Sequence, residues 1–211
     1  MTRQQRLRGL YVITGARHPA HGTLLEQVDA ALAGGARLVQ YRDKGDDRAR
    51  RRREAGDLLR LCRTRGVPLI INDDLALAVE SGADGVHLGR DDPALAEARR
   101  RLGPGALIGV SCYDRFELAL AAQAGGADYV AFGRFFPSRS KPQAVQAEIG
   151  LLQRARRELQ VPVVAIGGIT PENGGPLIAA GADMLAVIDG VFGQPDIHAA
   201  SRRFARLFPD N

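Results

Sequence analysis

Two kinds of block alternate along the whole chain. Eight short runs are almost continuously apolar, which is typical of strands buried on both faces of a parallel sheet. We predict these strands at residues 10–14, 36–42, 67–72, 84–89, 106–111, 128–133, 161–167 and 183–189. Segments between them carry apolar residues at three- and four-residue spacing, which predicts helices. We predict helices at residues 24–33, 52–63, 75–81, 94–102, 116–124, 150–159 and 174–181.

This order of strands and helices predicts an α/β fold with a parallel sheet covered by helices. Eight such strands are typical of a (β/α)8 TIM barrel, and 211 residues place it at the compact end of the size range. The alternative is an open doubly wound sheet, which usually has a glycine-rich turn after its first strand. The sequence there, GARHPAHGT, lacks that pattern. No linker divides the chain, so we predict a single barrel domain over residues 1–211.

A weak repeat precedes or overlaps every second predicted strand. Its four copies are GGARLVQ, SGADGVHLG, GGADYVAFG and AGADMLAVI. We expect a glycine of each copy to end the preceding helix in a left-handed turn. The repeat therefore suggests units of two strands and two helices, as a barrel requires.

The composition narrows the cellular setting. No apolar stretch approaches the roughly 18 residues of a membrane span, and the short apolar run near the start lacks the cleavage site of a signal peptide. Cys62 and Cys112 lie far apart without metal-ligand spacing. Two free thiols in a reducing compartment are the simplest interpretation, so we expect a cytoplasmic protein.

The net charge of +5 raises the question of a nucleic-acid partner. The densest basic run, RARRRRE at residues 48–54, has acids on both sides and is better explained as a solvated helix face. Aromatic residues make up only 5% of the chain, and there is no Trp to stack on bases. We therefore expect small-molecule substrates and neither a nucleic acid nor a membrane as partner, and leave a homo-oligomer open.

Lysine is used at only two positions. Of the 29 basic residues, all but Lys44 and Lys141 are arginine. Lysine supplies a compact, flexible point charge that arginine does not. Because both lysines follow predicted strands, we expect both to bind a ligand.

The second predicted strand ends in VQYRDK. Side chains alternate across a strand, so Gln40, Arg42 and Lys44 share one face, and Tyr41 and Asp43 share the other. Polar and charged groups at a barrel mouth need a partner. A polyanion fits them, since arginine grips oxygens with its planar fork and lysine adds a point charge.

Carboxylates follow the third and fourth predicted strands. Neighbouring strands lie roughly 4.8 Å apart, so acids just past their ends can reach one cation. Mg²⁺ prefers hard oxygens, usually one or two carboxylates plus substrate phosphates. We assign Asp73 and Asp92 to Mg²⁺, with Asn72 beside them as a hydrogen-bonding group. The simpler role of an acid in this place is helix capping, which Asp74 or Asp91 can perform.

Later strand ends offer further anion-binding groups. Two hydroxyls and the second lysine, Ser138, Ser140 and Lys141, lie in a loop bounded by prolines and anchored by the apolar stem FGRFF. After the seventh strand, Gly167 and Gly168 let a ligand approach the backbone, and Thr170 is expected to cap a helix. Barrels often bind phosphate with the loops after strands seven and eight. The sequence thus predicts two anion sites across one mouth.

The chain resembles the thiamine phosphate synthase family through motifs in a fixed order: LYVIT, VQYRDK, LIINDD, GVHLGRDD, IGVSC, VAFGRFFPSRSK and VVAIGGIT. The resemblance covers nearly the whole chain. It implies a (β/α)8 barrel and a Mg²⁺-dependent transferase. Such an enzyme joins hydroxymethylpyrimidine diphosphate to a thiazole monophosphate, releases diphosphate and forms thiamine phosphate.

The resemblance also implies residue roles. Gln40, Arg42, Lys44 and Asn72 would bind the pyrimidine diphosphate, with Ser111 at the pyrimidine and Lys141 at the diphosphate. Asp73 and Asp92 would hold Mg²⁺. The thiazole phosphate would lie at Ser138, Ser140, Gly168, Ile188 and Asp189. Tyr41, Asp43 and Arg139 complete the substrate-binding candidates, and Arg42, Lys44 and Lys141 are the catalytic candidates.

Some positions depart from the family pattern. Thr14 and Gly15 stand where an acid is common, Arg90 where Gln is usual, and Asp189 where Ser is usual. Because an acid repels phosphate, we expect the side chain of Asp189 to point away and only its amide to contribute. We expect His87 to be a buried strand histidine with a satisfied hydrogen bond rather than a general base.

Two other functions compete with this interpretation. A thiazole tautomerase on the same fold needs the thiazole phosphate site but no cluster of metal and diphosphate ligands. A barrel that binds phosphates or RNA without catalysis would show steeply salt-dependent binding and no Mg²⁺-dependent turnover.

Overall fold

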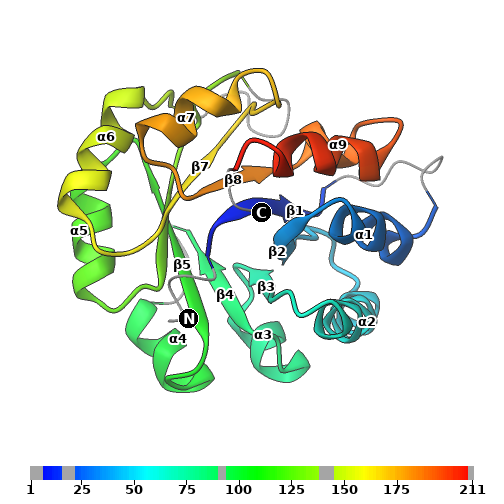
Figure 1. Ribbon diagram of the computed structural model, residues 1–211. Helices are drawn as coiled ribbons and strands as arrows, with labels where there is room; N and C mark the ends of the chain where they lie inside the picture. The colour runs from blue at the N-terminus through cyan, green and yellow to red at the C-terminus, as the bar shows by residue number, and fades with distance from the viewer. Residues whose placement is uncertain (1–6, 16–21, 90–93, 138–144, 209–211) are drawn as a thin grey trace.

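Eight parallel strands hydrogen-bond in chain order, and β8 pairs with β1, which closes the sheet into a barrel. This computed structural model describes residues 7–15, 22–89, 94–137 and 145–208. The helices pack around the outside of the strands (Figure 1). The predicted (β/α)8 barrel is therefore confirmed, and the open doubly wound sheet is wrong.

The element bounds follow the predicted pattern closely. The strands are β1 (Gly9–Ile13), β2 (Ala36–Tyr41), β3 (Leu69–Asn72), β4 (Gly85–Leu88), β5 (Leu107–Tyr113), β6 (Tyr129–Phe132), β7 (Val163–Ile166) and β8 (Met184–Val187). The helices are α1 (Leu24–Ala33), α2 (Arg48–Thr64), α3 (Leu75–Ser81), α4 (Leu95–Leu102), α5 (Phe116–Ala124), α6 (Ile149–Glu158), α7 (Gly174–Ala180), α8 (Asp189–Phe192) and α9 (Ile197–Ala205).

Where bounds differ from prediction, local chemistry explains the difference. Helix α2 begins at Arg48, four residues before its predicted start, because the Asp47 side chain accepts a hydrogen bond from the Arg50 N–H and caps a turn made of charged residues. Strands β3 and β7 each begin just after a proline, Pro68 and Pro162, which has no N–H to donate to a neighbouring strand.

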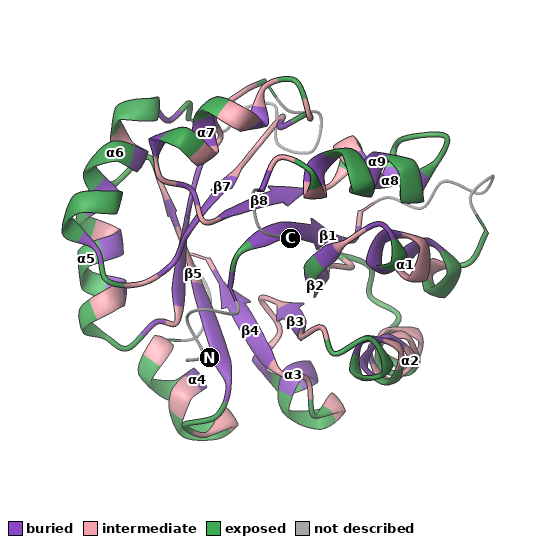
Figure 2. Ribbon diagram, viewed as in Figure 1, coloured by how far each residue is buried: buried purple, intermediate pink, exposed green. Residues whose placement is uncertain are grey.

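Apolar side chains form two separate layers. One fills the space between the strands and the surrounding helices, and includes Leu58, Val130 and Leu185. The other fills the inside of the barrel, and includes Leu38 and Met184. The strands are buried almost throughout, whereas the helices expose their outer faces (Figure 2). Burial on both faces explains why the strands appear in the sequence as continuous apolar runs.

The predicted repeat has a clear structural basis at the lower end of the barrel, where the strands begin. Each copy places one glycine at positive φ between helix and strand, namely Gly35, Gly82, Gly126 and Gly181. In three copies the aspartate that follows accepts a hydrogen bond from a backbone N–H at the start of the preceding strand. These pairs are Asp84 with Leu69 (2.9 Å), Asp128 with Ile108 (2.8 Å) and Asp183 with Val163 (2.8 Å). The aspartate of the repeat therefore links the beginnings of two neighbouring strands by a hydrogen bond.

The last helix, α9, was not predicted. It packs against α1 and β1 and so lies beside the seam where β8 meets β1 (Figure 1). Within the described part of the chain, no helix is long and apolar enough to span a membrane.

Candidate active site

The carboxyl ends of all eight strands meet at one end of the barrel, the mouth, because the strands are parallel and closed. Thr14, directly after β1, ties two of these ends together. Its hydroxyl accepts a hydrogen bond from the Arg42 N–H at 2.8 Å and donates to the Arg42 carbonyl at 3.1 Å. Thr14 thus fixes the backbone from which the Arg42 side chain extends.

A cavity of about 420 Å³ lies beside this junction. It is lined by Thr14, Gly15, Leu24, Tyr41, Arg42, Asp43, Lys44 and Arg50. The Arg42 side chain is half-buried, and among the described residues no carboxylate forms an ion pair with it. A half-buried guanidinium beside a cavity suits an anionic ligand.

Lys44 and Asp73 come together from the ends of β2 and β3. The Lys44 ammonium forms an ion pair with Oδ2 of Asp73, and the Asn72 amide donates to the same oxygen at 2.7 Å. Asp73 has a left-handed backbone with φ of 61°, which non-glycine residues seldom adopt. The side chains of Lys44 and Asp73 remain 58% and 32% exposed, so incoming ligands can reach both.

The neighbouring acid Asp74 has the structural role predicted as its alternative. Its Oδ1 accepts a hydrogen bond from the Leu77 N–H at 2.8 Å and caps α3, and its Oδ2 forms an ion pair with Arg51 at 2.9 Å. Asp91 and Asp92 lie outside the described residues.

Within β2, Gln40 and Tyr41 point to opposite sides, as the alternation of the strand predicts. Beyond the end of the strand the predicted division does not hold, since Arg42, Asp43 and Lys44 line the same cavity. The Tyr41 hydroxyl donates to Glu54 of α2 at 2.8 Å, and burial raises the pKa of Tyr41. Asp43 accepts from the Gly45 N–H at 2.7 Å and pairs with Arg50 at 2.9 Å. Both side chains therefore hold the turn after β2, and any contact of theirs with substrate remains a prediction.

Inside the barrel, a chain of hydrogen bonds joins Gln40 to Ser111. Gln40 Nε2 donates to the Tyr11 hydroxyl at 2.5 Å, which lies 2.9 Å from the Tyr129 hydroxyl. The Tyr129 hydroxyl is 3.0 Å from Nδ1 of His87, and Nε2 of His87 is 2.9 Å from Oγ of Ser111. His87 is therefore the buried, hydrogen-bonded strand histidine that the sequence predicts.

The segment after β6 folds back against β7. The Phe135 and Phe136 N–H groups donate to the carbonyls of Ile166 and Gly167, and the buried Phe135 anchors the stem as predicted. Ser138, Arg139, Ser140 and Lys141 lie outside the described residues. Their assignments stay predictions.

The glycine pair after β7 packs against another segment of the chain. A Cβ on Gly167 would lie 2.3 Å from Cβ of Arg134, and a Cβ on Gly168 would lie 2.3 Å from the Pro137 carbonyl oxygen. The close approach that these glycines allow is that of the chain's own 134–137 segment. The approach of a ligand to this backbone stays a prediction.

The helix after β7 begins at the residue that its apolar spacing predicts, but its predicted cap is wrong. Thr170 was predicted as its cap, but α7 begins at Gly174, and the Thr170 N–H instead donates to the Asn173 side chain at 2.8 Å. The Thr170 carbonyl accepts from the Asn173 and Gly174 N–H groups, which makes a separate turn before the helix. After β8, the exposed Asp189 begins the single turn α8.

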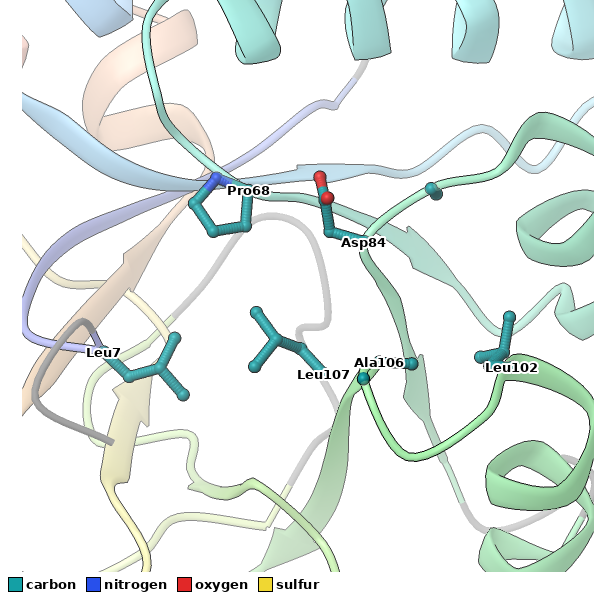
Figure 3. Close-up of a pocket in the computed structure, with 8 residues that line it drawn as sticks. Leu7, Pro68, Asp84, Leu102, Ala106 and Leu107 are labelled. Carbon is teal, nitrogen blue, oxygen red and sulfur yellow. The ribbon is translucent and has the colours of Figure 1, made fainter. Parts of the chain in front are cut away.

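A second cavity, of about 430 Å³, lies at the lower end of the barrel (Figure 3). It is lined by Leu7, Pro68, Ala83, Asp84, Leu102, Gly105, Ala106 and Leu107. The Asp84 carboxylate already accepts the Leu69 N–H described above, and the other lining side chains are apolar. This cavity therefore lacks the basic side chains that line the cavity at the mouth, and it is less suited to an anion.

Sequence reasoning missed Thr14, Tyr11 and Tyr129 as parts of the site. A usable signal existed for the tyrosines, since LYVIT and DYVAF each place a hydroxyl in an otherwise apolar strand. A buried tyrosine hydroxyl usually finds a hydrogen-bond partner, so these two positions could have been used to predict polar groups inside the barrel.

Comparisons with known proteins agree with this geometry. The family model described as thiamine monophosphate synthase matches residues 10–191. A thiamine-phosphate synthase of Thiobacillus denitrificans is 56% identical over 95% of this chain and 94% of its own length. The corresponding protein of Thioalkalivibrio sulfidiphilus is 52% identical over 97% of both chains. The solved thiamine phosphate pyrophosphorylase of Pyrococcus furiosus superposes with a TM-score of 0.85, at 31% identity over 96% of both chains.

Proposed function

The chain belongs to the thiamine monophosphate synthase family and is a transferase that forms thiamine phosphate; we propose that it acts on hydroxymethylpyrimidine diphosphate and a thiazole monophosphate with Mg²⁺. The bond between the pyrimidine methylene carbon and the diphosphate oxygen breaks. A bond from that carbon to the thiazole nitrogen forms, and diphosphate leaves.

The arrangement of charge at the ends of β2 and β3 supports this proposal most directly. Arg42 is half-buried with no ion-pair partner among the described residues, and Lys44 lines the same cavity. A diphosphate would supply negative charge to pair with the Arg42 guanidinium. The adjoining cavity of about 420 Å³ falls in the size range of small-molecule sites.

The donor atoms at this place suit Mg²⁺. Asp73 presents a hard carboxylate at the mouth, with its Oδ2 already oriented by Lys44 and Asn72. Asp73 and Asp92 would hold the ion, and substrate oxygens would complete its coordination. Bound there, Mg²⁺ would neutralise charge on the diphosphate oxygens.

The protein's own task is to stabilise a leaving group. Arg42, Lys44 and Lys141 would lower the energy of the negative charge that grows on the departing diphosphate. The aminopyrimidine delocalises the positive charge left on its methylene carbon, so dissociation can precede attack. The thiazole nitrogen then captures the cation. No protein nucleophile is needed, and catalysis rests on electrostatic stabilisation and positioning.

We assign the second phosphate to the opposite part of the mouth. Ser138, Arg139 and Ser140 would supply side-chain donors from the loop after β6. Gly168, Ile188 and Asp189 would supply backbone N–H groups, an arrangement that barrels often use after strands seven and eight. The Asp189 side chain is exposed at the start of α8 and is not needed for this contact.

The remaining proposals concern compartment and partners. Cys62 and Cys112 are both free and buried. Free thiols are usual in a reducing compartment, so we propose a cytoplasmic enzyme that acts on small molecules.

The decisive experiment supplies both phosphorylated heterocycles, with and without Mg²⁺, and measures diphosphate and thiamine phosphate. We expect both products in equal amounts and only with the metal. Rearrangement of the thiazole phosphate without diphosphate release would instead identify a tautomerase.

A further inference from the structure

A continuous line of five polar side chains crosses the barrel interior just below the mouth. It contains Gln40 of β2, Tyr11 of β1, Tyr129 of β6, His87 of β4 and Ser111 of β5, with consecutive polar atoms between 2.5 and 3.0 Å apart. The two ends of this line, Gln40 and Ser111, are both substrate-binding candidates. The three residues between them have no assigned function.

The interior of the barrel is shaped to hold this line. Tyr11 and Tyr129 are 1% and 0% exposed, so water does not satisfy their hydroxyls. Their rings meet edge to face, with centroids 6.0 Å apart, and the Tyr129 ring stacks on His87 at 5.5 Å. Gly109 of β5 makes room for Tyr129, since a Cβ there would lie 2.0 Å from the ring and 2.3 Å from the hydroxyl oxygen.

Counting protons gives the line a direction. Gln40 donates to Tyr11, so the single proton of the Tyr11 hydroxyl must go to its other partner, Tyr129. The Tyr129 proton then goes to Nδ1 of His87. His87 is left with its proton on Nε2, which donates to Oγ of Ser111.

Ser111 therefore ends the line with its own proton still to donate. Its side chain is part-exposed near the carboxyl end of β5, and within the described residues its hydroxyl proton has no acceptor. An acceptor atom of a ligand at the mouth, such as a ring nitrogen of a pyrimidine, matches this donor.

We propose that Tyr129, together with Tyr11 and His87, is a positioning residue that fixes the Ser111 hydroxyl as a hydrogen-bond donor toward the pyrimidine ring. This proposal rests on the proposed function, since it takes the pyrimidine to be the ligand. Tyr129 touches no substrate and acts through the tautomer of His87. Burial raises the pKa of both tyrosines, which keeps their hydroxyls protonated and the line intact at neutral pH.

The tautomer of His87 can be measured without any substrate. Nitrogen-15 NMR of the labelled full-length protein distinguishes the two ring nitrogens, and loss of one signal set in His87→Asn assigns it among the four histidines. We expect Nδ1 without a proton and Nε2 with one, a pattern that Tyr129→Phe should lose. A proton on Nδ1 in the unaltered protein would mean that the Gln40 amide is reversed and Ser111 is an acceptor, which overturns the proposal.

Kinetics tests whether Tyr129 acts through Ser111. Removing one neutral hydrogen bond typically changes an equilibrium by about tenfold, so we expect Tyr129→Phe to lower kcat by about tenfold with little change in KM. In the double variant Tyr129→Phe/Ser111→Ala, kcat should fall no further than in Ser111→Ala alone. If the fold-loss of kcat in the double variant equals the product of the losses in the two single variants, Tyr129 acts independently of Ser111 and the proposal is refuted.

Two further variants separate positioning from folding. Gly109→Ala should displace the Tyr129 ring and reproduce the kinetic loss of Tyr129→Phe while both tyrosine hydroxyls remain. Ser201→Ala removes a buried hydroxyl that has no hydrogen-bond partner in the part of the chain that the structure describes, and it should leave kcat and the His87 signals unchanged. If the unaltered protein makes no thiamine phosphate, the proposed function fails, whereas the NMR result still decides the direction of the line.

Discussion

Asp73 and Asp74 are adjacent carboxylates with different tasks, and backbone conformation makes the difference. Positive φ at Asp73 turns its side chain toward Lys44 at the mouth. Asp74 is the N-cap of α3, and its side chain accepts a hydrogen bond from the Leu77 N–H. The sequence presents both as acids after a strand, and only the geometry separates ligand from cap.

Substituting each acid in turn should separate activity from stability. Asp74→Ala removes a helix cap and should lower the free energy of unfolding by about 1 kcal/mol, with kcat/KM retained. Asp73→Ala should reduce kcat/KM by roughly a hundredfold or more, because a ligand of the metal and the partner of Lys44 is lost. Urea unfolding and a diphosphate-release assay measure the two quantities. Loss of activity in Asp74→Ala with its fold intact would reverse the two assignments.

Much of the candidate site could be predicted from residue types alone, because charged residues directly after an apolar strand stand out in the sequence. Arg42, Lys44 and Asp73 were predicted in this way, and the structure places all three at the mouth. Tyr11 and Tyr129 were not, because 118 residues separate them and only closure of the barrel brings their hydroxyls together. A local pattern can indicate a buried hydroxyl, but it does not indicate which distant residue that hydroxyl contacts inside the barrel.

The segment after β6 and the glycines after β7 form one packed unit. Gly168 has φ of 62°, and the Pro137 carbonyl oxygen occupies the space where its Cβ would be. Gly82, at the end of α3, has a similar φ of 67° and nothing within 4 Å of the same position. The two glycines thus share backbone strain and differ in packing.

Comparing alanine substitutions at Gly82 and Gly168 should isolate the contribution of packing to stability, because the backbone strain is similar at both positions. Gly82→Ala incurs only left-handed strain and should cost about 1 kcal/mol of unfolding free energy. Gly168→Ala must also displace a carbonyl and should cost roughly 3–5 kcal/mol. Thermal or urea unfolding of the two variants gives the comparison. Equal losses would indicate that the 134–137 segment yields without cost and does not pack tightly on β7.

Helices were predicted best where a glycine marks their end. Helices α1, α3 and α5 begin and end at the predicted residues, and each has a glycine at its C-cap, namely Gly34, Gly82 and Gly125. The single turn α8 is too short for periodicity to show, and α9 begins after the irregular segment GQPD. The helix cap at Asp47 and the separate turn at Thr170 depend on side-chain hydrogen bonds that apolar spacing does not report.

The whole barrel buries ionisable groups in both of its layers. Burial raises the pKa of Cys62 and of Cys112 to about 12, in the layer between strands and helices. Burial likewise raises the pKa of Tyr11 and Tyr129 inside the barrel. These side chains are stable only as neutral groups, so their protonation is linked to folding of the entire sheet.

This linkage predicts a protein that loses stability in alkali. Above about pH 9 the unfolded thiols ionise while the folded ones keep their protons up to about pH 12, so the unfolded state binds fewer protons and the unfolding free energy falls. Each thiol contributes a slope of about 1.4 kcal/mol per pH unit across that window, and the contribution is fully present below it. Urea unfolding at several pH values between about 8 and 11 should show the fall, and the double variant Cys62→Ala/Cys112→Ala should show a shallower one. An equal slope in the variant would mean that the thiolates form in the folded protein and that the space between strands and helices admits water.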